Sequence, residues 1–181
     1  MPMSHMVFLL RGINVGGRAR VPMAELRETL GDLGLTDVET YLQSGNVAFA
    51  APSDDPEDLV GTVEAALADR FGFEIRVLLR THGDLAAVVA DNPFLARASG
   101  PKSLHVAFLA AAPPAQRVDG LDPDRSPPDA FAVAGREIYL HYPNGAGRSK
   151  LTLDYLERQL GTVGTARHWN TVTRLASMTA P

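Results

Sequence analysis

Two glycine-bearing loops that carry cationic side chains are the parts of this sequence best suited to chemistry. The first loop contains Arg11, Asn14, Gly16, Gly17 and Arg18. It follows a predicted buried strand and precedes a predicted helix, a place where backbone N–H groups bind anions. It matches neither G-x-G-x-x-G nor G-x-x-x-x-G-K-[ST], and the alternative is a strand–helix connection whose glycines adopt positive φ.

The second loop, Tyr142–Lys150, leads from a predicted strand into a predicted helix. Its glycine, amide, hydroxyl and cationic residues are Asn144, Gly145, Gly147, Arg148, Ser149 and Lys150. Two cations beside a capping serine are unfavourable at a helix N-terminus, so they suggest a counter-anion such as phosphate or carboxylate. The alternative is a solvated loop whose cationic side chains point to water.

Two shorter polar segments could add directional hydrogen bonds. Gln43, Ser44 and Asn46 lie in a turn, where Ser44 has no neighbouring histidine or acid to activate it as a nucleophile. An ordinary hairpin turn is the alternative. Arg167, Trp169 and Asn170 form the other segment, in which the only tryptophan could stack on a base or sugar. Trp169 also falls on the apolar stripe of a terminal helix, which favours core packing.

Composition excludes several classes of site. The chain has no cysteine, which removes disulfides, thiol nucleophiles and the usual zinc sites. His105, His141 and His168 lie on or just beyond separate predicted strands without H-x-x-x-H spacing, so no metal is expected and no cofactor is identified. A net charge of −4 argues against a generic nucleic-acid coat. With no signal peptide and no apolar run near the ~20 residues that span a bilayer, we expect a cytoplasmic protein that does not bind membranes.

Hydrophobic periodicity predicts the elements that position these loops. In the first half, strands are expected at 6–10, 38–42, 47–50 and 73–79, with helices at 22–33 and from Asp55-Pro56 to 71. A bridging helix follows at 81–90, capped by Thr81. In the second half, strands are expected at 104–109, 131–133, 137–142 and 163–167, with helices at 113–118 and 149–160 and a terminal helix through 169–178. Each half has the order βαββαβ.

That order predicts an α+β fold of two ferredoxin-like units in tandem, an internal duplication. The expected parts are residues 1–80, a bridging segment 81–100, and residues 101–181 with the terminal helix. Right-handed crossovers place the loop after the first strand beside the hairpin between the second and third strands. The same topology brings 144–150 near 167–171, so the polar motifs gather in two places.

The motifs resemble a widespread bacterial family of uncharacterised proteins, the domain-of-unknown-function family numbered sixteen ninety-seven. The resemblance is carried in order by 9–17, 41–47, 92–94, 139–145, 148–150 and 165–171, which include Leu-Arg-Gly-Ile-Asn-Val-Gly-Gly and Gln-Ser-Gly-Asn. His168 departs from the family, whose usual residue there is Asn. The resemblance implies a compact α+β fold of ferredoxin-like character and supplies no activity.

The sequence supports two functional hypotheses. The first is a protein, possibly an enzyme, that binds a small phosphate- or carboxylate-bearing molecule. Its anion contacts would be Arg11, Arg18, Arg148, Lys150 and Arg167. Directional hydrogen bonds would come from Gln43, Ser44, Asn46, Asn144 and Asn170. The second, less favoured, is a nucleic-acid or protein interaction module. Binding of single-stranded RNA needs exposed aromatic side chains on the sheet, and Tyr139 is the one fair candidate. The oligomeric state is left open.

Overall fold

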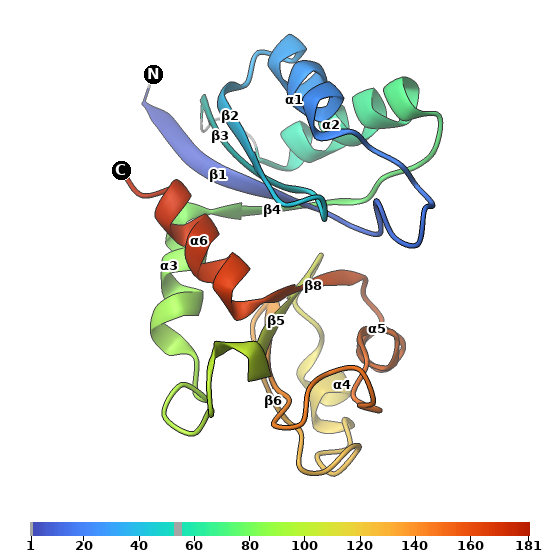
Figure 1. Ribbon diagram of the computed structural model, residues 1–181, viewed down its shortest axis with the longest axis vertical. Coiled ribbons are helices and arrows are strands. Elements are labelled where there is room, and N and C mark those ends of the chain that lie inside the picture. The colour runs from blue at the N-terminus through green and yellow to red at the C-terminus, as the bar shows by residue number, and fades with distance from the viewer. Residues whose placement is uncertain (1, 53–55) are drawn as a thin grey trace. The chain divides into compact units, whose positions relative to one another are not determined.

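The chain forms two compact units, each built around its own antiparallel sheet. The computed structural model describes residues 2–52 and 56–181, and within them lie two four-stranded sheets and six α-helices (Figure 1). One unit comprises the chain up to Ala86 together with Leu175–Pro181, and the other comprises Ala87–Arg174. The helix after the first sheet and the terminal helix are therefore each divided between the two units.

The first unit follows the predicted order of strands and helices. Its elements are β1 (Met3–Leu10), α1 (Met23–Asp32), β2 (Thr36–Tyr41), β3 (Asn46–Pro52), α2 (Pro56–Phe71) and β4 (Val77–Thr81). The strand order is β2-β3-β1-β4, and all neighbouring strands are antiparallel. Asp55, part of the predicted start of α2, lies outside the described residues.

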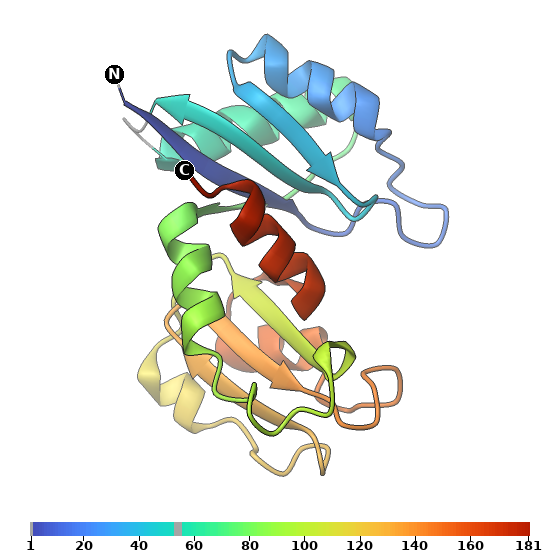
Figure 2. The same ribbon diagram turned by 60° about the vertical axis from the view of Figure 1, so that its left-hand side comes forward.

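The core of the first unit lies between its sheet and helices α1 and α2, which run side by side on one face (Figures 1 and 2). Alternate strand residues such as Phe8 and Leu10 of β1 point into this core, where they meet Leu26 and Leu30 of α1. The period of two in the strand and of three to four in the helix bring these side chains onto facing surfaces. Phe8 also stacks on Phe49, with ring centroids 4.2 Å apart.

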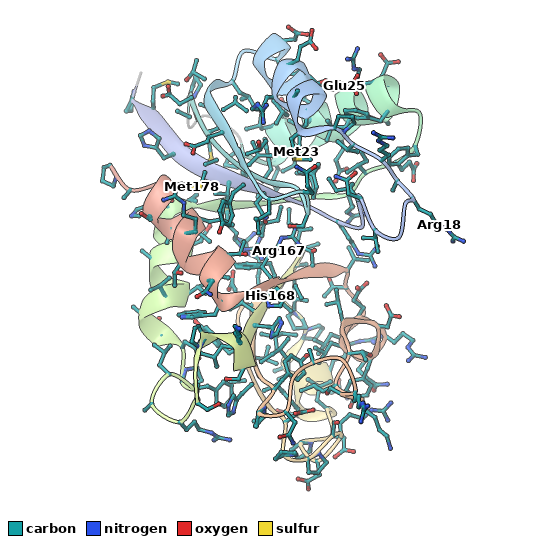
Figure 3. All side chains as sticks on the ribbon, viewed as in Figure 1. Arg18, Met23, Glu25, Arg167, His168 and Met178 are labelled. Atoms are coloured by element: carbon teal, nitrogen blue, oxygen red, sulfur yellow. The ribbon has the colours of Figure 1, made fainter. Side chains whose placement is uncertain are left out.

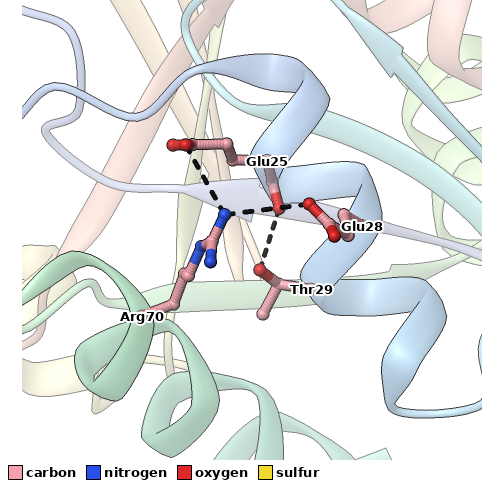
Figure 4. Close-up of polar contacts among 4 residues, drawn as sticks. All are labelled: Glu25, Glu28, Thr29 and Arg70. Carbon is pink, nitrogen blue, oxygen red and sulfur yellow. Dashed lines mark hydrogen bonds and ion pairs between the residues drawn. The ribbon is translucent and has the colours of Figure 1, made fainter.

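A small ion-pair cluster joins the outer sides of α1 and α2. Arg70 of α2 lies 3.5 Å from Glu25 and 3.7 Å from Glu28 of α1, and Thr29 donates a hydrogen bond to the backbone carbonyl of Glu25 (Figure 4). All three charged side chains are close to half exposed or more. Because water screens exposed pairs, each contributes less than about 1 kcal/mol, and the apolar core is the main support of the helix pair.

The second unit repeats the order of the first. Its sheet and covering helices are β5 (Leu104–Leu109), α4 (Ala115–Asp119), β6 (Ala130–Ala134), β7 (Glu137–His141), α5 (Leu153–Leu160) and β8 (Gly164–His168), preceded by the short 3₁₀ helix η1 (Pro101–Ser103). The strand order is β6-β7-β5-β8, again antiparallel throughout. Ala107 and Leu109 of β5 pack with Leu156 and Leu160 of α5 in the core of this unit.

Helix α3 (His82–Asp91) begins where the sequence predicts. Thr81 Oγ1 accepts a hydrogen bond from the backbone N–H of Asp84, and the Asp84 carboxylate accepts one from the backbone N–H of Thr81. This reciprocal cap satisfies two N–H groups at the helix start. The terminal helix α6 (Trp169–Met178) also forms as predicted. None of the described helices combines the length and hydrophobicity needed to cross a membrane.

Strand β4 is shorter than the predicted 73–79 and is shifted toward the C-terminus. Its partner β1 ends at Leu10, which is opposite Val77, so Phe73 and Ile75 lie beyond the last residue of β1. The two side chains still pack against the core. The alternation of apolar and polar residues over 73–76 therefore reflects which side chains are buried, although this segment has no partner strand.

Candidate functional site

The first glycine loop and the Gln43–Asn46 turn lie together, as chain topology predicts. Asn14 holds them in place, because its Nδ2 donates to the carbonyls of Gln43 (2.7 Å) and Val21 (3.0 Å). Its Oδ1 accepts from the N–H of Val21, and its own N–H donates to the carbonyl of Ala19. The Asn14 amide thus fastens the loop to the hairpin.

The turn is also held by internal contacts. Asn46 is fully buried, and its Nδ2 donates to the carbonyl of Tyr41 and to Ser44 Oγ. Gly45 has φ of +85°, and its carbonyl accepts from the N–H of Leu10 at 2.9 Å. The Asn46 amide and the Ser44 hydroxyl, both predicted to bind a ligand here, therefore already have partners within the hairpin.

The remaining members of the first cluster are on the surface. Gly16 and Gly17 both have positive φ and are exposed, and Arg18 points away from the loop into solvent (Figure 3). The N–H of Arg18 donates to the carbonyl of Val15, which closes the tip of the loop. Arg11 is half-buried, and its N–H donates to the carbonyl of Arg76.

In the second cluster, the helix expected at 149–160 starts at Leu153. Thr152 is its cap, since Thr152 Oγ1 accepts from the N–H of Tyr155 at 3.1 Å. Ser149 instead donates to the Asp129 carboxylate and accepts from the N–H of Leu151. Arg148 and Lys150 therefore precede the helix, and the prediction that they flank its capping serine is wrong.

The loop before α5 is anchored to the segment that precedes β6. Besides the Ser149–Asp129 contact, the N–H of Lys150 donates to Ser126 Oγ at 3.0 Å, and Arg125 Nε donates to the carbonyl of Lys150 at 3.3 Å. Asn144, Gly147 and the side chain of Lys150 are exposed.

The three predicted site residues around the end of β8 have different environments. Arg167 is buried, and one guanidinium nitrogen donates to Thr165 Oγ1 at 2.6 Å and to the carbonyl of Ala166 at 3.1 Å. Burial lowers the pKa of Arg167 to about 10. Trp169 is buried, which confirms the preference for core packing, whereas Asn170 is exposed.

A pocket of about 430 Å³ opens in the second unit, where β7 and β8 end and β5 begins. It contains two of the predicted residues, Gly145 and Asn170. The rest of its lining was not predicted: Ser99, Gly100, Pro101, Lys102, Ser103, Tyr142 and Pro143.

Short-range hydrogen bonds give the pocket its shape. Ser103 donates from both N–H and Oγ to the carbonyl of Gly100, at 3.2 and 2.8 Å, which forms the turn of η1. The N–H of Tyr142 donates to the carbonyl of Ser103 at 2.7 Å, and the N–H of Gly145 donates to the carbonyl of Tyr142 at 3.0 Å. The Tyr142 hydroxyl donates to the carbonyl of Leu151, and burial raises the pKa of Tyr142 to about 12. Tyr142 is therefore a neutral side chain that lines the pocket in a fixed position.

The unsatisfied polar atoms of the second unit gather near the same end of its sheet. Among the described residues, three buried side-chain atoms have no hydrogen-bond partner, namely Asn92 Nδ2, His105 Nδ1 and His141 Nδ1. Leu104 is opposite His141 in the β5–β7 ladder, and His105 is opposite His168 in the β5–β8 ladder. Buried groups of this kind are rare and commonly mark a bound water, an ion or a functional role.

His105 and His141 lie on opposite faces of the sheet, because His141 is opposite Leu104 and not His105 in the β5–β7 ladder. On one face His105 meets the rings of His168 and Tyr142, with centroids at 4.3 and 5.1 Å. On the other face His141 stacks on Phe94. Burial, reinforced by His168, lowers the pKa of His105 to about 4, and burial also lowers the pKa of His141.

The aromatic side chain needed for an RNA-binding sheet is not exposed. Tyr139, the candidate from the sequence, is buried, and its hydroxyl donates to the carbonyl of Val88 at 3.2 Å. Phe8, Phe49 and Phe108 are buried as well. No observation therefore favours stacking of bases on either sheet over the described residues.

The place of the pocket-lining residues before β5 follows from the strand pairing of the second unit. Antiparallel pairing places the end of β8 next to the start of β5, and the same pairing places 99–103 there. The Gly100-Pro101 pair instead suggested a boundary between units. Lys102, one of only two lysines, was consequently not selected as a site residue.

Comparisons with known proteins give a family and a fold. A family model described as "Protein of unknown function (DUF1697)" matches residues 3–139, which include Ser99–Ser103 and end before Tyr142. No curated protein matches the chain. The solved structure of conserved bacterial protein SP0830 from Streptococcus pneumoniae is similar, with a TM-score of 0.73 and 24% identity over 99% of this chain and 100% of that one. At this identity the likeness shows the fold alone.

Proposed function

The chain belongs to the DUF1697 family of proteins of unknown function, and we propose that it binds a small molecule with a phosphate or carboxylate group in the pocket of the second unit. The observation that carries this proposal is the lining: a lysine and a serine from the segment before β5 and an asparagine from the start of α6 border one pocket. Lys102 supplies the positive charge. Ser99 and the Asn170 amide supply hydrogen bonds that orient an anionic group.

The rest of the lining suits the uncharged part of such a ligand. Tyr142, Pro101 and Pro143 offer ring surfaces, and the volume of about 430 Å³ falls within the range of small-molecule sites. Because the Tyr142 hydroxyl is bonded to Leu151, that side chain presents its ring and not a mobile hydroxyl. A ligand with one anionic group and one flat or apolar group matches this lining.

We propose that the two units are ferredoxin-like repeats, because they share the βαββαβ order and equivalent strand orders, β2-β3-β1-β4 and β6-β7-β5-β8. In the second repeat, the segments after its third and fourth strands meet the segment before its first strand. The cytoplasmic location expected from the sequence remains part of the proposal.

Binding is expected to depend on Lys102 and not on Lys150. We would titrate phenyl phosphate, benzoate and the neutral analogue benzamide, using ligand-observed NMR. Lys102→Ala should weaken binding of the anionic probe roughly fivefold to tenfold, the range for one partly exposed charge-assisted hydrogen bond. Asn170→Ala should weaken it less, and benzamide should not discriminate among the proteins.

Lys150→Ala is the matched control, since it removes the only other lysine, which is also exposed. Both lysine side chains lie at the surface, so both variants are expected to fold like the wild type. If wild type and Lys102→Ala bind the anionic probe with equal affinity, or if only Lys150→Ala binds it more weakly, the anion does not bind in this pocket.

A further inference from the structure

We propose that His105 and His168 form a binding site for a divalent transition metal ion such as Zn²⁺ or Ni²⁺. The two histidines are direct partners in the antiparallel β5–β8 ladder. Partners of this kind have Cβ atoms about 4.5–5.5 Å apart and project from the same face of the sheet. Backbone pairing thus sets the separation of the two imidazoles before any ion binds.

The distance between the rings suits a shared ion. Their centroids are 4.3 Å apart, with the ring planes tilted by 47°. An imidazole nitrogen binds zinc at about 2.0–2.1 Å, which puts each ring centroid roughly 3.2 Å from the metal. Two such centroids lie roughly 5.2 Å apart when the angle at the metal is tetrahedral, as for Zn²⁺, and roughly 4.5 Å apart when it is a right angle, as for an octahedral ion. Small side-chain rotations are therefore enough to direct one nitrogen of each ring to a common point.

At least one ring nitrogen of His105 is available for this role. His105 is about nine-tenths buried, and its Nδ1 has no hydrogen-bond partner in the structure. His168 lies at the junction of β8 and α6 and is exposed, so its ring can be reached from solvent. A buried acceptor without a partner is costly, and metal coordination would satisfy it.

The chemistry of the pair selects the class of ion. Neutral imidazole suits Zn²⁺, Ni²⁺ and Cu²⁺ and is a poor ligand for Mg²⁺ or Ca²⁺, which prefer oxygen. Within the part of the chain that the structure describes, no third His, Asp or Glu joins the pair to make a metal-binding group. Water would fill the other positions, so the bound ion would exchange readily.

The test uses the full chain labelled with ¹³C-histidine and titrated with Zn²⁺. With five histidines, the side-chain signals of each ring can be followed separately. The expected result is a saturable shift of the His105 and His168 signals, while those of His5 and His82 stay in place. Mg²⁺ at the same concentrations should leave all five unchanged.

Variants decide whether the two rings act together. His168→Gln changes an exposed side chain and should weaken zinc binding roughly tenfold or more, a loss reached even when only the partners of metal ligands are removed. His5→Gln is the control and should bind like the wild type. The proposal is overturned if zinc shifts neither ring, or if His168→Gln binds zinc as tightly as the wild type. Because the readout is zinc and not an anionic probe, it can fail while the proposed function holds.

Discussion

Replacing Gly45 by Ala is expected to lower the free energy of unfolding of the first unit by roughly 2–5 kcal/mol. Gly45 has φ of +85°, and an added Cβ would lie 2.7 Å from Leu10 Cβ and 2.8 Å from Ile13 Cδ1. Left-handed backbone costs a non-glycine residue about 1–2 kcal/mol, and overpacking adds about 1–3 kcal/mol. Urea denaturation followed by circular dichroism would measure the loss.

Gly34→Ala separates the two contributions. Gly34 lies in the same unit with nearly the same φ, +87°, but an added Cβ would meet nothing within 4 Å. This variant should lose only the backbone share, about 1–2 kcal/mol. Equal losses at the two positions would mean that the hairpin is not packed tightly against β1, and the first loop and turn would again be open to a ligand.

Acid is expected to destabilise the second unit through His105. Its pKa falls to about 4 in the folded protein from an ordinary value of 6.5, because the ring is buried and lies beside His168, with Tyr142 against its other side. Between these two pH values the His105 ring is protonated in the unfolded chain and stays neutral in the folded chain. The contribution of His105 to the free energy of unfolding is therefore fully present above pH 6.5. It decreases as the pH falls toward 4, by about 3 kcal/mol in total.

The comparison that isolates this effect is His105→Phe, which keeps a ring against Tyr142 and removes the titrating group. Free energies of unfolding would be measured for both proteins from pH 7.5 to pH 4 with a chelator present, so that no metal contributes. The wild type should lose about 3 kcal/mol more than the variant across this interval. Parallel curves would show that His105 is protonated as easily in the folded chain as in the unfolded one.

Much of the fold could be predicted because both periodicities are clear in the sequence. The buried run of β5 and the capping of α3 by Thr81 were located to within a residue, since each depends on local chemistry. The start of α5 could not be located in this way. Ser149 and Thr152 are equally good caps by residue type, and the contact between Ser149 and Asp129, twenty residues away, decides between them.

The candidate site was harder to predict for the same reason. Chain topology correctly predicted that the first loop lies beside the Gln43–Asn46 turn and that Gly145 lies near Asn170. Residue type alone did not reveal that Asn14 and Asn46 would be used to hold the backbone, or that Lys102 would line a pocket. Whether a polar side chain bonds to the protein's own backbone or is free to bind a ligand depends on distances between segments, and only the structure gives those distances.

The most direct measurement uses the fact that the chain has only two lysines. Reductive methylation with ¹³C-formaldehyde labels Lys102, Lys150 and the α-amine while keeping their positive charge, and the Lys102→Ala and Lys150→Ala variants assign the signals. Titration with phenyl phosphate is predicted to shift the Lys102 signal to saturation and to leave the Lys150 signal in place. A Lys102 signal that stays fixed while another group saturates would contradict binding of an anionic ligand in this pocket.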